Sequence, residues 1–280
     1  MESRIRRDFL RTAATALAAS PWLAQAQQQP SSAAPLAATH DMSDMPAAWT
    51  GKEQIGMLLY PGFTALDFVG PQHMFAGLMG ATVHHVAASA EPVASDTHLS
   101  VVPTTTYAQC PAELDILFVP GGGPGTLAAL QDDALLRFVH ERGRRAKWVS
   151  SVCTGSLLLG AAGLLKGYRA TTHWATMSLL PVAGAVAVES RVVRDRNRIT
   201  GAGVSAGLDL GLAMVALLRD RRYAEMTQLL AEYAPQPPFA AGTPRTAPPD
   251  VRALVEPMFA GFNDEARVAL ARRAAAPVGG

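Results

Sequence analysis

The sequence is poor in cysteine. Only two cysteines, Cys110 and Cys153, occur among its 280 residues, which excludes the disulfide framework of a small secreted scaffold. Cys110 lies in a loop before one predicted strand and Cys153 follows another, so we expect no disulfide. His84, His85 and His98 show no recognised metal-ligand spacing, and we predict no metal site.

The sequence also lacks an excess of charge of either sign. Its formal net charge is +1, 17% of its residues are charged and 49% are hydrophobic, as in an ordinary globular chain with one sizeable core. The basic clusters at 142–147 and 219–222 are short, and we interpret them as solvated helix ends rather than phosphate sites. A nucleic-acid partner is therefore not indicated.

The first 26 residues have the pattern of an export signal. Arg6 and Arg7 precede a modest apolar stretch, which ends at an A-x-A cleavage pattern, Ala24 to Ala26. This stretch is shorter than the roughly 20 apolar residues of a transmembrane helix. We predict a twin-arginine signal peptide, a periplasmic product and no membrane anchor after cleavage. The alternative is a disordered basic N-terminus with accidental spacing.

The rest of the chain divides by composition. Residues 27–53 are rich in Gln, Pro, Ser and Ala, which predicts a disordered linker. Over residues 54–245, short apolar runs alternate with helical patterns, as is typical of parallel strands joined by crossover helices. A proline-rich segment, "APQPPFAAGTPRTAPPD", follows the last of these helices. Residues 246–280 are predicted to form a tail with one helix.

Cys153 lies between a predicted strand, 147–152, and a predicted helix that starts with Gly155. Strand, sharp turn and helix form the layout of a nucleophile elbow, which exposes a reactive side chain at the edge of a sheet. The positive end of a helix dipole favours the thiolate, the reactive form of cysteine. The alternative is a buried structural thiol, and this stretch alone does not decide between them.

Two further stretches place candidate catalytic groups directly after predicted strands. In "FVPGGGPG", the N–H groups of Gly121 and Gly122 could face a developing anion, although a glycine turn alone is a weak signal. In "LDFVGP", Asp67 is either a helix cap or a catalytic acid. Because the carboxyl ends of parallel strands share one sheet edge, we expect Asp67, the glycine turn and Cys153 to lie close together.

Four stretches, "IGMLLYPGFTALDFVGP", "LDILFVPGGGPG", "SVCTGSLLLGAAGLLKGYRATTHW" and "LLAEYAPQPPFAAGTP", together resemble the ThiJ/PfpI (DJ-1/PfpI) superfamily and, within it, the isonitrile hydratase branch. The resemblance spans residues 54 to about 245. It implies an α/β fold: a flavodoxin-like three-layer α/β/α sandwich of the class I glutamine amidotransferase type, with a mainly parallel sheet. It also implies a homodimer.

The resemblance assigns a role to individual residues. It places the nucleophile on Cys153, the neighbouring acid on Asp67 and the oxyanion-hole glycines on Gly121 and Gly122. Thr154 matches the threonine that follows the cysteine in the hydratase branch, where protease-like members have a histidine. This residue therefore argues against a Cys-His arrangement for peptide hydrolysis.

The implied activity is cysteine-dependent hydration of a small isonitrile to an N-substituted formamide, without cofactor or metal. Cys153 and Asp67 would share one proton, which raises the pKa of the acid, and Thr154 would position water. His173, in the shared "TTHW", either lines the pocket or packs beneath it, and we favour packing.

Two other functions stay open. A glyoxalase, deglycase or stress-related enzyme of the same superfamily would use the same cysteine and acid, and Thr154 weakens that alternative only modestly. A non-catalytic ligand-binding domain, as in some AraC-type transcription regulators, shares the "CTG…TTHW" pattern. Those regulators carry an additional helix-turn-helix domain, for which we see no room after residue 245.

Overall fold

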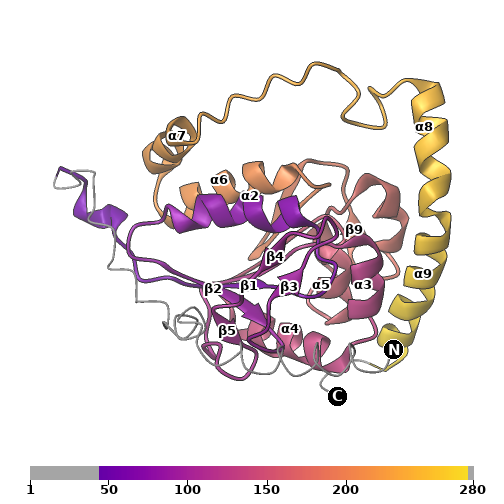
Figure 1. The fold of residues 1–280 in the computed structure, drawn as a ribbon, viewed down its shortest axis with the longest axis horizontal. Coiled ribbons are helices and arrows are strands. Elements are labelled where there is room, and N and C mark those ends of the chain that lie inside the picture. Colours follow the sequence, from indigo (N-terminus) through magenta and orange to yellow (C-terminus); the bar gives the residue numbers. More distant parts are fainter. Residues whose placement is uncertain (1–43, 277–280) are drawn as a thin grey trace, which may run out of the picture. The chain divides into compact units, whose positions relative to one another are not determined.

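A mainly parallel sheet forms the centre of the computed structural model, which describes residues 44–276 (Figure 1). Within these residues the sheet has seven strands in the order β10-β11-β7-β6-β1-β2-β5, and its β10–β11 pair is antiparallel. The strands are β1 (Gln54–Leu58), β2 (Thr82–Ala87), β5 (Thr105–Thr106), β6 (Ile116–Val119), β7 (Trp148–Val152), β10 (Val192–Asp195) and β11 (Arg198–Gly201). The remaining short strands form two separate ribbons: β3 (Val93–Ala94) with β4 (Ser100–Val101), and β8 (Arg169–Ala170) with β9 (Val186–Ala187).

The central strands are apolar on both faces. Every residue of β6, "ILFV", is buried, and so are four of the five residues of β1. Continuous apolar strands of this kind occur where helices cover both faces of a parallel sheet. The predicted fold class is confirmed: this is a flavodoxin-like α/β fold with a mainly parallel sheet and flanking helices.

Helices flank the sheet in two groups. The helices α2 (Ala65–Ala76) and α6 (Ala206–Leu218) lie together on one face, and α3 (Gly123–Ala129), α4 (Asp133–Arg145) and α5 (Gly155–Ala161) lie on the other (Figure 1). The remaining helical segments before the C-terminal region are η3 (Trp174–Leu179) and α7 (Arg221–Leu230). Helices α2 and α6 approach closely at Gly211, where an added Cβ would lie 2.8 Å from Met74 Cβ.

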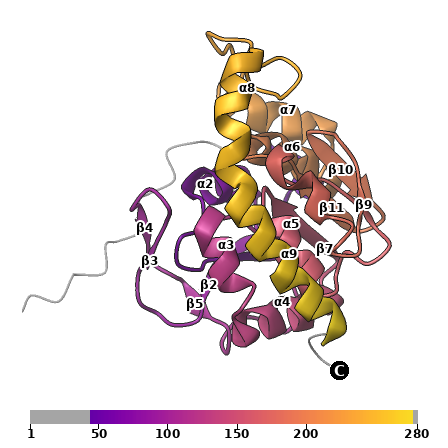
Figure 2. The same ribbon diagram turned by 90° about the vertical axis from the view of Figure 1, so that its right-hand side faces the viewer.

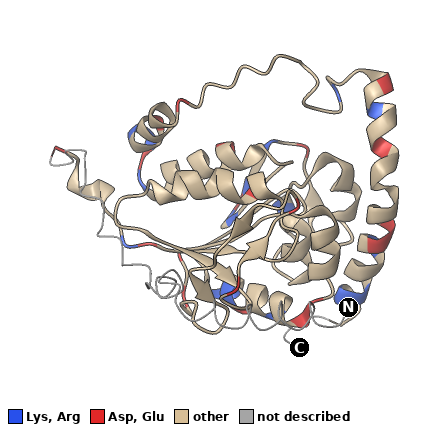
Figure 3. Cartoon of the chain, viewed as in Figure 1, with Lys and Arg blue, Asp and Glu red and all other residues tan. Residues whose placement is uncertain are grey.

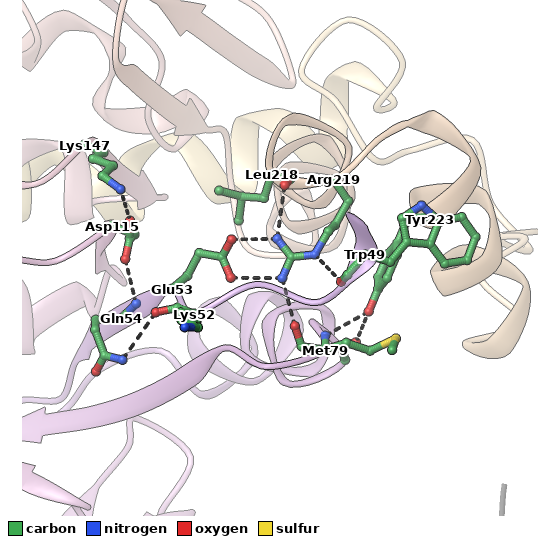
Figure 4. A network of polar contacts seen from close by, with 11 residues as sticks. Trp49, Lys52, Glu53, Gln54, Met79, Asp115, Lys147, Leu218, Arg219 and Tyr223 are labelled. Carbon is green, nitrogen blue, oxygen red and sulfur yellow. Dashed lines mark hydrogen bonds and ion pairs between the residues drawn. The ribbon is translucent and has the colours of Figure 1, made fainter. Parts of the chain in front are cut away.

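The N-terminal boundary of the folded part differs from the predicted one. Residues 46–53, expected to belong to a linker, pack on the junction of α6 and α7 (Figure 4). Trp49, in the short helix η2 (Ala47–Trp49), is buried and donates its Nε1–H to Asp220 at 2.7 Å. Arg219 donates to the Trp49 carbonyl and to Glu53, at 2.6 Å in each case. These contacts make the segment part of the domain, whereas the predicted signal peptide and residues 27–43 lie outside the described residues.

The C-terminal region also belongs to the domain. We predicted a tail with one helix, and the structure has α8 (Pro249–Val255), η4 (Glu256–Phe259) and α9 (Ala260–Ala275), which follow one another (Figure 2). Helix α9 packs on α3, α5 and η3 and buries Ala266 and Leu270. Asn263 donates to the Ala175 carbonyl at 2.9 Å. None of the helices within residues 44–276 combines the length and the hydrophobicity that a membrane span requires.

Candidate active site

The predicted site residues meet at the carboxyl edge of the sheet. Cys153 follows β7, the glycines follow β6, and Asp67 lies in the first turn of α2, the helix after β1. The Gly121 N–H donates to Asp67 Oδ2 at 2.9 Å, and the Gly122 N–H donates to Thr154 Oγ1 at 3.1 Å. The structure therefore brings these five residues together, as the strand order predicts.

Cys153 occupies a sharp strand-to-helix turn. Its φ of +57° lies in the left-handed region, which is unusual for a residue other than glycine and marks local backbone strain. The turn is held from both sides: the Cys153 N–H donates to the Ala202 carbonyl at 2.8 Å, and the Cys153 carbonyl accepts from Thr172 Oγ1 at 2.8 Å. The next turn needs Gly155, because a Cβ there would lie 2.3 Å from the Val119 carbonyl oxygen. This geometry is that of a nucleophile elbow.

Asp67 is an acid in a place where its charge is costly. Its side chain is fully buried, and burial raises its pKa from the ordinary 3.8 to about 7. Hydrogen bonds from the Gly121 N–H and the Cys153 thiol offset part of this shift. Within the described residues, no N–H or O–H group donates to Asp67 Oδ1, so this oxygen is free to hold a proton. The raised pKa agrees in direction with the expectation from sequence.

The Cys153 thiol is also held in its neutral form. Burial is the main cause of its raised pKa, and the charge of Asp67 adds to it. The N–H groups of Thr154 and Val204 donate to the sulfur and oppose the shift. We expected the helix N-terminus to favour the thiolate, but desolvation outweighs that effect because Cys153 is only 6% exposed. Since both ionised forms are disfavoured side by side, the pair titrates as one unit that holds one proton near neutral pH.

Thr154 joins the glycine turn to a buried hydroxyl cluster. Its Oγ1 accepts from the Gly122 N–H and lies 2.8 Å from Thr126 Oγ1, which in turn lies 3.3 Å from the Tyr60 hydroxyl. Sequence reasoning missed Tyr60, Thr126 and the Val204 N–H. A signal existed for the first two, because each is a polar side chain within a few residues of the end of a predicted apolar strand.

The two glycines of the turn donate their N–H groups to side chains of the site. Their N–H groups bind Asp67 and Thr154, so both are already engaged and neither points freely at an anion. A Cβ on Gly121 would lie 2.6 Å from Thr154 Oγ1 and 2.8 Å from Asp67 Oδ2. Glycine is needed because the acid and the threonine approach the backbone so closely. The oxyanion role of Gly121 and Gly122 stays a prediction.

His173 is partly buried by its neighbours. Its Nδ1 accepts from the Ala175 N–H at 3.3 Å, which caps η3, and its ring stacks on Phe259 with centroids 5.1 Å apart. It also lies against Gly203, where a Cβ would come within 2.8 Å of its Cδ2. Burial lowers the pKa of His173, which favours the neutral ring. These are packing contacts, and the place of His173 relative to a substrate pocket stays a prediction.

The structure also bears on disulfides, metal sites and surface hollows. Cys110 and Cys153 are both free thiols. No group of three or more metal-ligating side chains occurs in the part of the chain that the structure describes. A hollow of about 650 Å³ lies between α9 and the end of α3, where its lining includes Leu130, Val268 and Arg272. None of the predicted site residues lines this hollow.

Comparisons with known proteins agree with this geometry. Residues 53–217 match the model of the DJ-1/PfpI family. The chain is 50% identical over 196 residues to an isonitrile hydratase of Pseudomonas putida, an alignment that covers 70% of this chain and 85% of that protein. A crystal structure of a ThiJ/PfpI family protein from Pseudomonas syringae superposes with a TM-score of 0.81 at 54% identity, covering 83% of this chain and 98% of the other.

A more distant relative is a regulator. The HTH-type transcriptional regulator GbdR of Pseudomonas aeruginosa is 29% identical over 171 residues, or 58% of this chain and 46% of the regulator. The family match, the isonitrile hydratase similarity and the nucleophile elbow all support one assignment: the chain belongs to the DJ-1/PfpI family.

Proposed function

We propose that this protein hydrates a small isonitrile to an N-substituted formamide, with Cys153 as the nucleophile. The buried pair of Cys153 and Asp67 is the observation that carries the proposal, because it keeps one proton beside a sulfur atom near neutral pH. Addition of a thiol to an isonitrile carbon needs both of these components. The similarity to an isonitrile hydratase supports the same reaction.

In the first half of the reaction, the sulfur electron pair forms a bond to the isonitrile carbon. The proton that the pair shares is delivered to the same carbon by Asp67, which is left ionised. The product is a thioimidate, R–N=CH–S–Cys153. Asp67 is suited to this transfer because its pKa of about 7 makes it a ready proton donor near neutral pH.

In the second half, water adds across the C=N bond, with its oxygen on carbon and one proton on nitrogen. The C–S bond then breaks and its electron pair returns to sulfur, while the hydroxyl proton passes to Asp67. This restores the one-proton pair and releases R–NH–CHO. Thr154 positions the water, since its Oγ1 is held beside Gly121 and the Asp67 carboxyl. Every proton in this sequence comes from the Cys153–Asp67 pair or from water.

A second copy of the chain is part of the proposal. We define the arm as residues 234–248; it carries Phe239, whose side chain is 78% exposed. Leu254 and Met258, on the helical segments after the arm, are also exposed. Helices α2 and α6 contain few charged residues (Figure 3), and the exposed face of α2 carries Leu66 and Val69. A two-fold homodimer would cover the apolar side chains of arm and face in both copies.

The proposed location is the periplasm, reached by export through the twin-arginine route. It rests on Arg6, Arg7 and the A-x-A pattern at the end of the apolar stretch. Replacing both arginines by lysine and fractionating cells tests it. The periplasmic pool is expected to disappear, and an unchanged pool would contradict the assignment.

The activity is tested by incubating the purified protein with cyclohexyl isocyanide and assaying N-cyclohexylformamide. Formamide is expected from the parent protein and not from Cys153→Ala, while Cys110→Ala serves as the matched thiol control and keeps its activity. Absence of formamide together with turnover of methylglyoxal would move the assignment to a glyoxalase. Saturable binding of isonitrile without any turnover would indicate a ligand-binding module.

A further inference from the structure

Three buried hydroxyl groups lie in a row behind the glycine turn. Thr154 Oγ1 and Thr126 Oγ1 are 2.8 Å apart, and Thr126 Oγ1 and the Tyr60 hydroxyl are 3.3 Å apart. All three side chains are buried, and they come from the ends of different elements: Tyr60 follows β1, Thr126 lies in α3 and Thr154 precedes α5. Each hydroxyl group in the row has one proton to donate, so the direction of the row follows from the partner at its end.

The row is anchored at one end by a group that can only accept. The Tyr60 hydroxyl donates to the Pro120 carbonyl at 3.0 Å. Burial raises the pKa of Tyr60 well above its ordinary value, so this phenol keeps its single proton. With that proton used, the Tyr60 oxygen can only accept from Thr126. The Thr126 proton is then used as well, so its oxygen can only accept from Thr154.

The same reasoning about hydroxyl protons fixes the hydrogen-bonding role of Thr154. Its proton points to Thr126, and one lone pair of its Oγ1 takes the Gly122 N–H at 3.1 Å. We propose that Tyr60 and Thr126 are positioning residues that hold Thr154 Oγ1 as a hydrogen-bond acceptor toward the reacting molecules. The remaining acceptor position lies near the acid, because Thr154 Oγ1 and Asp67 Oδ2 are both within 3 Å of the point that a Gly121 Cβ would occupy.

The direction of the hydroxyl row determines which step of the reaction Thr154 can assist. An acceptor pairs with an O–H or N–H of its ligand and gives nothing to a developing oxyanion. Attacking water presents such an O–H group, so the inference rests on the proposed hydration and deepens its second half. A mechanism in which Thr154 donates to an oxyanion would need the opposite direction of the whole row.

The direction of the row can be observed without any turnover. Neutron diffraction from deuterium-exchanged crystals of the protein locates the hydroxyl deuterons. We expect the Thr154 deuteron on the line to Thr126 Oγ1 and the Thr126 deuteron on the line to the Tyr60 oxygen. A Thr154 deuteron directed toward Asp67 or Cys153 would overturn the proposal, whether or not the protein hydrates isonitriles.

Kinetics of three variants give a second test. Thr126→Val breaks the row, Tyr60→Phe removes the acceptor of the Thr126 proton and frees Thr126 to donate to Thr154, and Thr126→Ser keeps the hydroxyl. Thr227→Val is the matched control, since Thr227 is a buried threonine in α7 that donates to its own helix. Loss of one oriented hydrogen bond predicts a drop in kcat of about tenfold for the first two variants, with KM nearly unchanged.

Thr126→Ser and Thr227→Val are expected to keep the parental kcat. Tyr60→Phe is the decisive variant because Tyr60 is separated from Thr154 by Thr126. A Tyr60→Phe protein with parental kcat, or a Thr126→Ser protein as slow as Thr126→Val, would overturn the inference. If the parental protein forms no formamide, the proposed function fails, and the deuteron positions still decide the direction of the row.

Discussion

The Cys153 turn and the arm differ in what holds them in place. The turn is buried and bonded to residues from other strands and loops, among them Ala202 and Thr172. The hydrogen bonds that we find in the arm are local, such as those between Thr243 and Thr246, and its Phe239 is exposed. The turn is thus specified by the chain itself, whereas the arm has the exposed apolar surface that a second copy would cover.

The turn and the arm also differ in how much their local structure costs in folding stability. The turn combines a left-handed cysteine with a buried acid, and both features cost stability. In the arm, by contrast, the Cβ position of Gly242 has open space around it. Substitutions in the two regions should therefore have opposite signatures: those in the turn change chemistry and folding, and those in the arm change association.

The largest effect is expected from Cys153→Ala. Loss of the nucleophile should lower formamide formation by on the order of 10³-fold or more, because no other thiol lies beside Asp67. The initial rate with cyclohexyl isocyanide measures it. Activity within tenfold of the parent would contradict the role of Cys153.

Asp67→Asn should make the protein more stable while removing activity. The folded-state pKa of Asp67 is raised from 3.8 to about 7, so the unfolded chain ionises first as pH rises. Stability that is fully present below pH 4 is lost between about pH 4 and 7, by up to about 4 kcal/mol for a shift of three units. Urea unfolding of parent and variant should show this gain at pH 8 and none at pH 3.5. An equal difference at both values would contradict the raised pKa.

Gly121→Ala should damage the turn, since its Cβ would meet Thr154 Oγ1 at 2.6 Å and Asp67 Oδ2 at 2.8 Å. We expect a loss of about 1–3 kcal/mol in the free energy of unfolding, together with most of the activity. Gly242→Ala in the arm is the matched control, because nothing lies within 4 Å of its Cβ position. Equal unfolding free energies for the two variants would remove the contrast between turn and arm.

Phe239→Ser should change association and leave the turn intact. If the proposed dimer buries Phe239, serine at this position removes about 1.5–3 kcal/mol of apolar burial, which predicts a dimer dissociation constant raised about tenfold or more. Sedimentation equilibrium measures it, with exposed Leu229→Ser on α7 as a comparison outside the arm. An unchanged dissociation constant, or a parent protein that is monomeric, would exclude the arm from the interface.

Much of the site could be predicted from sequence because it depends on strand order. Apolar runs locate the strands, and residues that follow parallel strands meet at one edge of the sheet. This rule predicts that Asp67 and Cys153 lie close together, and they do so in the structure. The fold class followed from the same alternation of strands and helices.

What sequence could not give depends on contacts between distant segments. The use of the Gly121 N–H by Asp67 and the row from Tyr60 to Thr154 follow from side-chain positions, which strand patterns do not contain. The same holds for the domain boundaries. Trp49 finds its partner Asp220 171 residues away, and no composition shift marks that contact.

In the proposed reaction, Cys153 forms a covalent bond to the isonitrile carbon. A rapid denaturing quench of the protein mixed with cyclohexyl isocyanide, followed by mass spectrometry of its peptides, tests this directly. We expect the peptide containing Cys153 to gain the mass of one isonitrile during turnover and to lose it once the substrate is consumed, while the Cys110 peptide stays unmodified. Formamide production with an unmodified Cys153 peptide throughout, or with the adduct on Cys110, would contradict it.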